Sequence, residues 1–154
     1  MTSPLQQVSL FASQDDETLQ LLEAKLRKCA FKQGQAILGQ NDPGADLYLI
    51  QSGHVAVHII AQNGEKIRLR TMGPGECFGE LSLLDGSPRS ADVSADSDCQ
   101  LLALSRDDFL AFFSTHPRVA EALIGLLAGR VRHLTERMQR AGLLGKDDVD
   151  LASS

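Results

Sequence analysis

One short stretch of the chain gathers several polar groups that could hold a ligand. Residues 78–93 read FGELSLLDGSPRSADV and carry a carboxylate at Glu80, a guanidinium at Arg89 and a hydroxyl at Ser90. A tight turn at Asp85-Gly86 separates the acid from the other two groups. A structural loop needs one or two such groups, whereas a site for a small ligand that is part anion and part sugar needs all of them. The stretch therefore predicts a ligand site.

The order of these residues suggests the chemistry. A helix that begins at Gly79-Glu80 exposes unpaired backbone N–H groups and a partial positive charge, which together bind anions. Arg89 lies beyond the turn and can fold back to clasp a phosphate with two parallel hydrogen bonds, and Ser90 adds a donor. Glu80 would repel a phosphate, so its expected partner is a ribose hydroxyl, as for the acidic residue of dinucleotide-binding folds. The expected ligand is a phosphate bonded directly to a ribose.

The stretch resembles the phosphate-binding cassette of cyclic nucleotide-binding domains, the family of the catabolite activator protein and of protein kinase A regulatory subunits. The family pattern is Phe-Gly-Glu-(Leu/Ile)-(Ala/Ser)-Leu, a short variable turn, then Pro-Arg-(Ala/Ser/Thr)-Ala. The matching residues are Phe78, Gly79, Glu80, Leu81, Ser82, Leu83, Pro88, Arg89, Ser90 and Ala91. Taken alone, Glu80 and Arg89 would also fit a loop salt bridge, but the whole spaced set favours the ligand site.

The resemblance implies a role for each residue of the cassette. It implies that Glu80 holds the ribose 2′-hydroxyl and Arg89 the exocyclic phosphate oxygen. Backbone groups would come from Gly79, Leu81 and Ser82, a side-chain contact from Ser90, and Phe78 belongs to the expected ligand-binding set. One departure is Asn41, in GQNDPG, where the family usually has glycine. Asparagine tolerates a left-handed conformation best among non-glycine residues, so the same turn is expected.

Composition restricts the class of protein. At 154 residues and 43% apolar, the chain suits one compact domain. A net charge of −5 does not indicate an electrostatic nucleic-acid binder, and no apolar run approaches the length of a membrane helix. The first residues lack the pattern of a signal peptide. Three widely separated cysteines, Cys29, Cys77 and Cys99, fit reduced thiols and predict a cytoplasmic protein.

The elements that must position the cassette can be predicted from patterns. Ser13 precedes an acid-rich helix start, and an apolar stripe carries that helix to about Arg27. Short alternating runs between glycine-bearing turns then indicate strands over about residues 30–104. Asn63-Gly64 is expected to supply both positive-φ positions of a tight hairpin, and Pro74-Gly75 a type II turn. The fold class is α+β, mainly β: a jelly-roll-like β-roll with a short N-terminal helix, a short cassette helix and a long C-terminal helix.

The C-terminal third reads as helical. RDDFLAFFSTHP predicts a short helix that ends before Pro117, and one long helix is expected over about residues 117–142. A single domain therefore covers residues 1–145, followed by an acidic tail at 146–154. No internal repeat and no interdomain linker is apparent.

The long helix carries a second signal. A heptad seam over three repeats, with alternating spacings of four and three, is formed by Ala120, Ile124, Leu127, Val131, Leu134, Met138 and Ala141. A neighbouring stripe, Val119, Leu123 and Leu126, could face the roll. One broad apolar face packed within the monomer is the alternative, but a parallel homodimer is favoured, and the family's transcription factors dimerise through this helix. If the roll opens outward as in the family, Leu134 would cap the base and Thr135 would bond to it.

Other reactive residues favour plainer interpretations. His54 and His58 are four apart, which in a strand separates them by about 13 Å, so no metal site is expected. Both are expected on the surface, and Cys77 is expected to be a buried structural thiol rather than a redox sensor. The arginines of the long helix, Arg130, Arg132, Arg137 and Arg140, read as solvated flanks of a coiled coil.

The expected activity is binding without turnover. Hydrolysis of a cyclic phosphodiester usually recruits two metals through paired His and Asp ligands, and no such pair is present in the sequence. No cofactor is therefore expected beyond the ligand, cAMP or possibly cGMP. Only residues 141–154 follow Arg140, too few for the helix-turn-helix unit of the family's transcription factors. Two readings remain, a stand-alone sensor acting on an unknown partner protein, or a regulatory domain of a longer effector, with no nucleic-acid or membrane contact of its own.

Overall fold

The computed structural model describes residues 11–12, 14–41, 43–44, 46–79 and 88–142. The predicted cassette helix at residues 80–87, Ser13 and the acidic tail lie outside these residues. In chain order the elements are α1 (Asp16–Glu23), β1 (Arg27–Phe31), β2 (Ala36–Leu38), β3 (Leu47–Ser52), β4 (Val55–Ile60), β5 (Lys66–Met72), β6 (Cys77–Phe78), β7 (Asp92–Ala95), β8 (Cys99–Leu104), α3 (Arg106–Thr115) and α4 (Pro117–Arg140). No helix of this described part is long and apolar enough to cross a bilayer.

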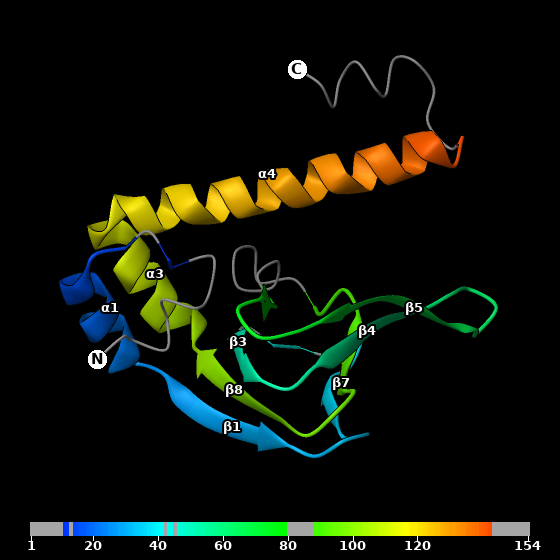
Figure 1. The fold of residues 1–154 in the computed structure, drawn as a ribbon, viewed down its shortest axis with the longest axis horizontal. Coiled ribbons are helices and arrows are strands. Elements are labelled where there is room, and N and C mark those ends of the chain that lie inside the picture. Colours follow the sequence, from blue (N-terminus) through cyan, green and yellow to red (C-terminus); the bar gives the residue numbers. More distant parts are fainter. Residues whose placement is uncertain (1–10, 13, 42, 45, 80–87, 143–154) are drawn as a thin grey trace.

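The strands form two antiparallel sheets of four, which together make a roll. The strand orders are β1-β8-β3-β6 and β2-β7-β4-β5. In Figure 1, α1 and α3 lie at one end of the roll, and α4 runs along it above the strands. The predicted fold class, a mainly β roll with flanking helices, is confirmed.

The roll begins earlier than its sequence pattern suggests, and the first helix ends earlier. Arg27 and Lys28 pair with Ala103 and Leu102 of β8, so β1 begins before Ala30. Both residues are charged and their side chains are exposed, so the sequence shows no alternation of apolar residues at the start of this strand. The helix α1 ends at Glu23, and residues 24–26 connect it to β1. The start of α1 is capped by Asp15, whose carboxylate accepts a hydrogen bond from the Thr18 N–H at 2.7 Å.

Two apolar clusters hold the elements together. The first lies between the helices and the roll and contains Leu19 and Leu22 of α1, Leu47 and Leu49 of β3, Phe109 of α3, and Val119 and Leu123 of α4. The second fills the roll and includes Ile50, Val55, Met72, Phe78, Val93 and Leu101. The stripe predicted to face the roll is confirmed, since Val119 and Leu123 are buried and Leu126 packs against them. The helices are thereby fixed to the sheets that carry the site.

Three turns test the local predictions. Asn41 has φ 71°, the expected left-handed conformation, and Gly75 has φ 89° in a turn closed by the Glu76 N–H and the Gly73 carbonyl at 3.2 Å. The prediction for Asn63 is wrong, because only Gly64 of that pair has a positive φ. The loop between β4 and β5 is longer than a two-residue hairpin: the Gly64 N–H bonds to the Ala61 carbonyl at 2.8 Å. A loop of this length needs a single left-handed residue.

Candidate functional site

Arg89 is the centre of the site. Its side chain is only 4% exposed, although the residue lies in a loop just before β7. Nη1 donates to the carbonyl oxygen of Gly79 at 3.3 Å, and Nη2 donates to that of Asp46 at 3.0 Å. The backbone of Arg89 is held as well, because its carbonyl accepts from the Asn41 N–H at 2.8 Å. Arg89, the side chain predicted to bind the phosphate, is thus held by two loops and points into the protein.

The guanidinium lacks a counterion among the described groups. The ion pairs of the described residues join Arg27 to Asp46 and Arg68 to Asp96, so the Asp46 carboxylate is already engaged. Burial lowers the pKa of Arg89, and the neighbouring Tyr48 and Asp46 oppose that shift. Nε of Arg89 is buried and has no hydrogen-bond partner. A buried cation with an unsatisfied donor costs free energy, which a bound anion would recover.

Two glycines make room for the guanidinium. A Cβ atom at Gly44 would lie 2.6 Å from Arg89 Nε, and one at Gly79 would lie 2.7 Å from Nη1. Gly79 also has φ 90°, a conformation that other residues avoid. Both positions therefore require glycine as long as Arg89 keeps its place.

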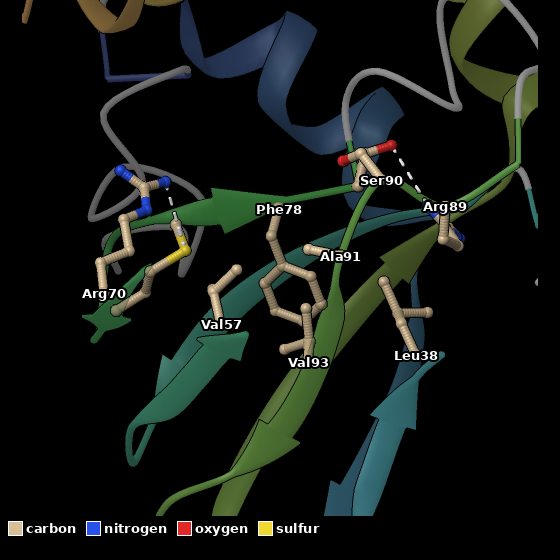
Figure 2. Close-up of a pocket in the computed structure, with 10 residues that line it drawn as sticks. Leu38, Val57, Arg70, Phe78, Arg89, Ser90, Ala91 and Val93 are labelled. Atoms are coloured by element: carbon tan, nitrogen blue, oxygen red, sulfur yellow. Dashed lines mark hydrogen bonds between the residues drawn. The ribbon is translucent and has the colours of Figure 1, made fainter. Parts of the chain in front are cut away.

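Arg89 lines two cavities. The first, of about 100 Å³, is lined by Leu38, Val57, Arg70, Met72, Phe78, Gly79, Arg89, Ser90, Ala91 and Val93. The second, of about 360 Å³, is lined by Ile37, Leu38, Gly39, Pro43, Gly44, Asp46, Tyr48 and Arg89. Figure 2 shows the first cavity as an apolar strip of side chains, with Arg89 and Ser90 at one end and Arg70 at the other. Such a strip can receive a flat apolar ring while Arg89 binds an attached anion.

Comparison with known protein families shows which family the chain belongs to. The protein-family model described as "Cyclic nucleotide-binding domain" matches residues 28–116, more than half of the chain. The chain belongs to this family. The family predicted from the cassette, that of cyclic nucleotide-binding domains, is therefore confirmed.

Individual relatives agree with that assignment. The "Cyclic AMP receptor protein" of Thermus thermophilus is 42% identical over 123 residues, covering 80% of this chain and 57% of that protein. A "CRP-like cAMP-activated global transcriptional regulator" of Mycobacterium tuberculosis is 28% identical over 138 residues, covering 90% of this chain and 62% of that protein. The chain thus spans about six-tenths of the length of these relatives.

Solved structures give the same result for the fold. The catabolite activator protein of Thermus thermophilus superposes with a TM-score of 0.81 at 38% identity, covering 87% of this chain and 63% of that one. A cyclic nucleotide-binding domain from Methylobacillus flagellatus superposes with a TM-score of 0.78 at 28% identity, covering 93% and 82%.

The predicted site residues of the domain fall into three groups. Phe78, Gly79, Arg89 and Ser90 meet at the first cavity, and Phe78 stacks on Tyr48 with ring centroids 5.3 Å apart. Glu80, Leu81 and Ser82 lie outside the described residues. Leu134 is 56% exposed, and the Thr135 hydroxyl donates to the Val131 carbonyl of its own helix at 2.8 Å. Neither lines either cavity, so their contact with a base stays a prediction.

Several residues of the domain's site were missed by sequence reasoning. Gly44 and Asp46 lie beside Arg89 in the loop after β2, and Tyr48 lies beside it in β3. Arg70 lines the first cavity from β5. Only GQNDPG, noted for its turn, pointed to the first of these segments. The interpretation of Arg130 as a solvated flank is wrong: it is partly buried, and Nη2 donates to the Cys77 carbonyl at 2.8 Å. The heptad pattern places Arg130 beside the seam but gives no sign of the strand beneath it.

The remaining reactive side chains are not part of the site. His54 is exposed as expected, whereas His58 is half-buried and its Nδ1 has no hydrogen-bond partner. Among the described residues, no group of three or more His, Cys, Asp or Glu side chains could hold a metal ion. Cys77 is buried, and burial raises the pKa of its thiol, which fits the expected structural role.

Proposed function

We propose that this domain binds cAMP and acts as a regulatory unit without turning the nucleotide over. The observation that best supports this proposal is Arg89, a buried cation that lines the cavity and whose Nε has no hydrogen-bond partner. A cyclic phosphate carries one negative charge and two exocyclic oxygens, which would complete the hydrogen bonds of the guanidinium and neutralise it. The apolar strip beyond Arg89 suits the sugar and the base.

The choice of cAMP has separate support. The two curated relatives reported above carry cAMP in their names. Ser90 lines the cavity and offers a hydroxyl beside Arg89. Because such a hydroxyl can also favour guanine, cGMP is the second candidate.

Calorimetry on the purified protein tests binding directly. A ligand that binds only the folded state, at 100-fold over its Kd, adds about 2.7 kcal/mol to the free energy of unfolding. For a chain of this length, Tm should rise by roughly 5–11 °C. The linear nucleotide 5′-AMP serves as a control for the cyclic phosphate. A melting curve that neither cAMP nor cGMP moves at millimolar concentration would refute the proposal.

Turnover is tested on the same samples. After incubation with Mg²⁺ or Mn²⁺, chromatography should recover the cyclic nucleotide intact. Linear monophosphate formed in proportion to protein concentration would show instead that the domain is a phosphodiesterase.

The long helix is the proposed route of output. Three of its apolar side chains are strongly exposed: Ile124 at 65%, Val131 at 60% and Leu134 at 56%. Their spacing matches one seam, and burial of such side chains against a second copy would stabilise a parallel homodimer. The same ligand site would serve a sensor that acts on a partner protein and a regulatory domain within a longer effector.

A further inference from the structure

Arg27 pairs with Asp46 from two strands away. Arg27 is the first residue of β1 and Asp46 lies directly before β3, and β8 runs between these strands in the first sheet (Figure 1). The register places Arg27 opposite Ala103 of β8, and Ala103 opposite Tyr48 of β3. Two strand spacings are about 10 Å, so the arginine side chain crosses β8 beside a residue with a small side chain. Its Nη2 then forms an ion pair with Oδ2 of Asp46.

Asp46 also contacts Arg89, through its backbone. Its carbonyl oxygen accepts from Arg89 Nη2 at 3.0 Å, so the side chain of Asp46 begins beside the guanidinium. Both residues line the second cavity. Burial raises the pKa of Tyr48, and the negative charge of Asp46 adds to that shift, just as it opposes the lowering of the pKa of Arg89. The charge of Asp46 therefore acts on the residue predicted to bind the phosphate.

One carboxylate thus has two arginines within its surroundings. Arg89 is 4% exposed and its Nε has no hydrogen-bond partner, so a carboxylate would be a strong partner for it. Rotation about the Cα–Cβ bond of Asp46 moves the carboxylate between staggered positions. In the structure the carboxylate is held by Arg27 instead. A carboxylate turned toward Arg89 would occupy the guanidinium that the phosphate needs.

We propose that Arg27 is a positioning residue, which holds the Asp46 carboxylate away from Arg89 and so keeps Arg89 accessible to the phosphate of the nucleotide. The proposal rests on the proposed function. Without Arg27, the Asp46 side chain acts as an internal anion that competes with the ligand. The backbone carbonyl of Asp46 keeps its contact with Arg89 in both arrangements, because only the side chain turns.

The experiment is a double-mutant cycle read by calorimetric titration. The Kd values of cAMP and cGMP are measured for the parent protein, Arg27→Ala, Asp46→Asn and the double variant. Arg27→Ala should weaken both nucleotides to the same degree, because the competition concerns the phosphate that they share. The loss should be at least about fivefold, since the competing contact involves a buried guanidinium and exceeds an exposed ion pair in strength.

The Asp46→Asn background separates competition from other roles of Arg27. Asp46→Asn alone should bind slightly more tightly than the parent, because an amide carries no charge to compete with the phosphate. In this background Arg27→Ala should cause no further loss. If Arg27 acted on the phosphate through its own charge, or on the fold, the loss would have the same size in both backgrounds.

Two further variants serve as controls. Arg27→Lys should keep most of the binding, because the contact with Asp46 uses one nitrogen atom and an ammonium can supply it. Arg68→Ala removes an arginine from a comparable exposed ion pair, that with Asp96. Neither Arg68 nor Asp96 lines the two cavities, so this variant should keep the Kd of the parent. Melting curves establish that each titration is made on folded protein.

Three results are decisive. A Kd of Arg27→Ala equal to that of the parent would show that the Asp46 carboxylate does not compete for Arg89. A loss of the same size with Asn at position 46 would overturn the proposal as well. A parent protein that binds neither nucleotide would refute the proposed function itself, a result distinct from the first two.

Discussion

Arg130 of α4 donates a hydrogen bond from Nη2 to the carbonyl oxygen of Cys77 in β6, at 2.8 Å. Cys77 is followed directly by Phe78 and Gly79, two residues that line the first cavity. The long helix is thus attached to the strand that begins the cassette. Burial lowers the pKa of Arg130, and the proximity of Arg70 contributes in the same direction.

Replacing Arg130 should therefore affect both stability and binding. Arg130→Met keeps most of the apolar packing and removes the charged donor, which should lower the free energy of unfolding by about 1.5–3 kcal/mol. Nucleotide affinity should fall as well, because β6 loses its connection to α4. Arg132→Met, on an exposed position of the same helix, is the control. Calorimetric titration of both variants would contradict the link if their Kd values agreed.

Removing Arg89 should abolish most of the binding. Loss of one partner of a desolvated charge pair costs roughly 2–5 kcal/mol, so Arg89→Ala should weaken cAMP by at least about thirty-fold. Arg89→Lys should recover only part of this loss, because lysine cannot form two parallel hydrogen bonds. A titration in which Arg89→Ala binds as tightly as the parent would place the phosphate elsewhere.

Gly44 should tolerate no side chain while Arg89 stays in position. A methyl group there would meet Nε at 2.6 Å, and crowding of this kind costs about 1–3 kcal/mol. Gly44→Ala should lower Tm and weaken the nucleotide. Gly125→Ala is the opposite case: nothing lies within 4 Å of the added methyl, and alanine in a helix should stabilise by about 1 kcal/mol. Equal melting curves for the two variants would show that a side chain at position 44 does not destabilise the protein through its contact with Arg89.

Ligand binding and dimerisation should be linked. If Leu134 and Thr135 approach the base from the seam, then cAMP should strengthen dimerisation by the same factor by which dimerisation strengthens cAMP binding. The coupling free energy between two such sites is commonly about 1–3 kcal/mol. The measurement is nucleotide affinity across a dilution series, with light scattering to follow dissociation. A Kd that stays constant through the dissociation range would exclude the coupling. Leu134→Ala would then weaken the dimer and leave the affinity of the monomer unchanged.

Part of the lining of the first cavity could be predicted because its signals are local. The cassette residues are adjacent in sequence, and the turns at Asn41 and Pro74-Gly75 depend on one or two backbone angles. The hairpin at Asn63 was predicted wrongly, because its geometry depends on where the pairing of β4 with β5 ends, which the dipeptide does not determine.

The missed residues depend on long-range geometry. In IRLR, strand alternation alone cannot say which arginine faces the cavity, and the bulge at Leu69 changes the alternation at that point. The contact of Arg130 with β6 could not be predicted, because it depends on which side of α4 faces the roll. Asp46 holds Arg89 through a backbone carbonyl, a contact that any residue type could supply.

The position of Arg89 between two cavities has a practical consequence. Leu38 and Arg89 are the residues that line both spaces, so the Arg89 side chain is shared by the two cavities. Truncation to alanine would enlarge the space beside both cavities and leave a gap with the shape and polarity of the missing group. The carbonyl oxygens of Gly79 and Asp46 would remain as acceptors in that gap. Guanidine or methylguanidine carries the donors that these acceptors lack, so we expect either compound to restore part of the binding that Arg89→Ala loses.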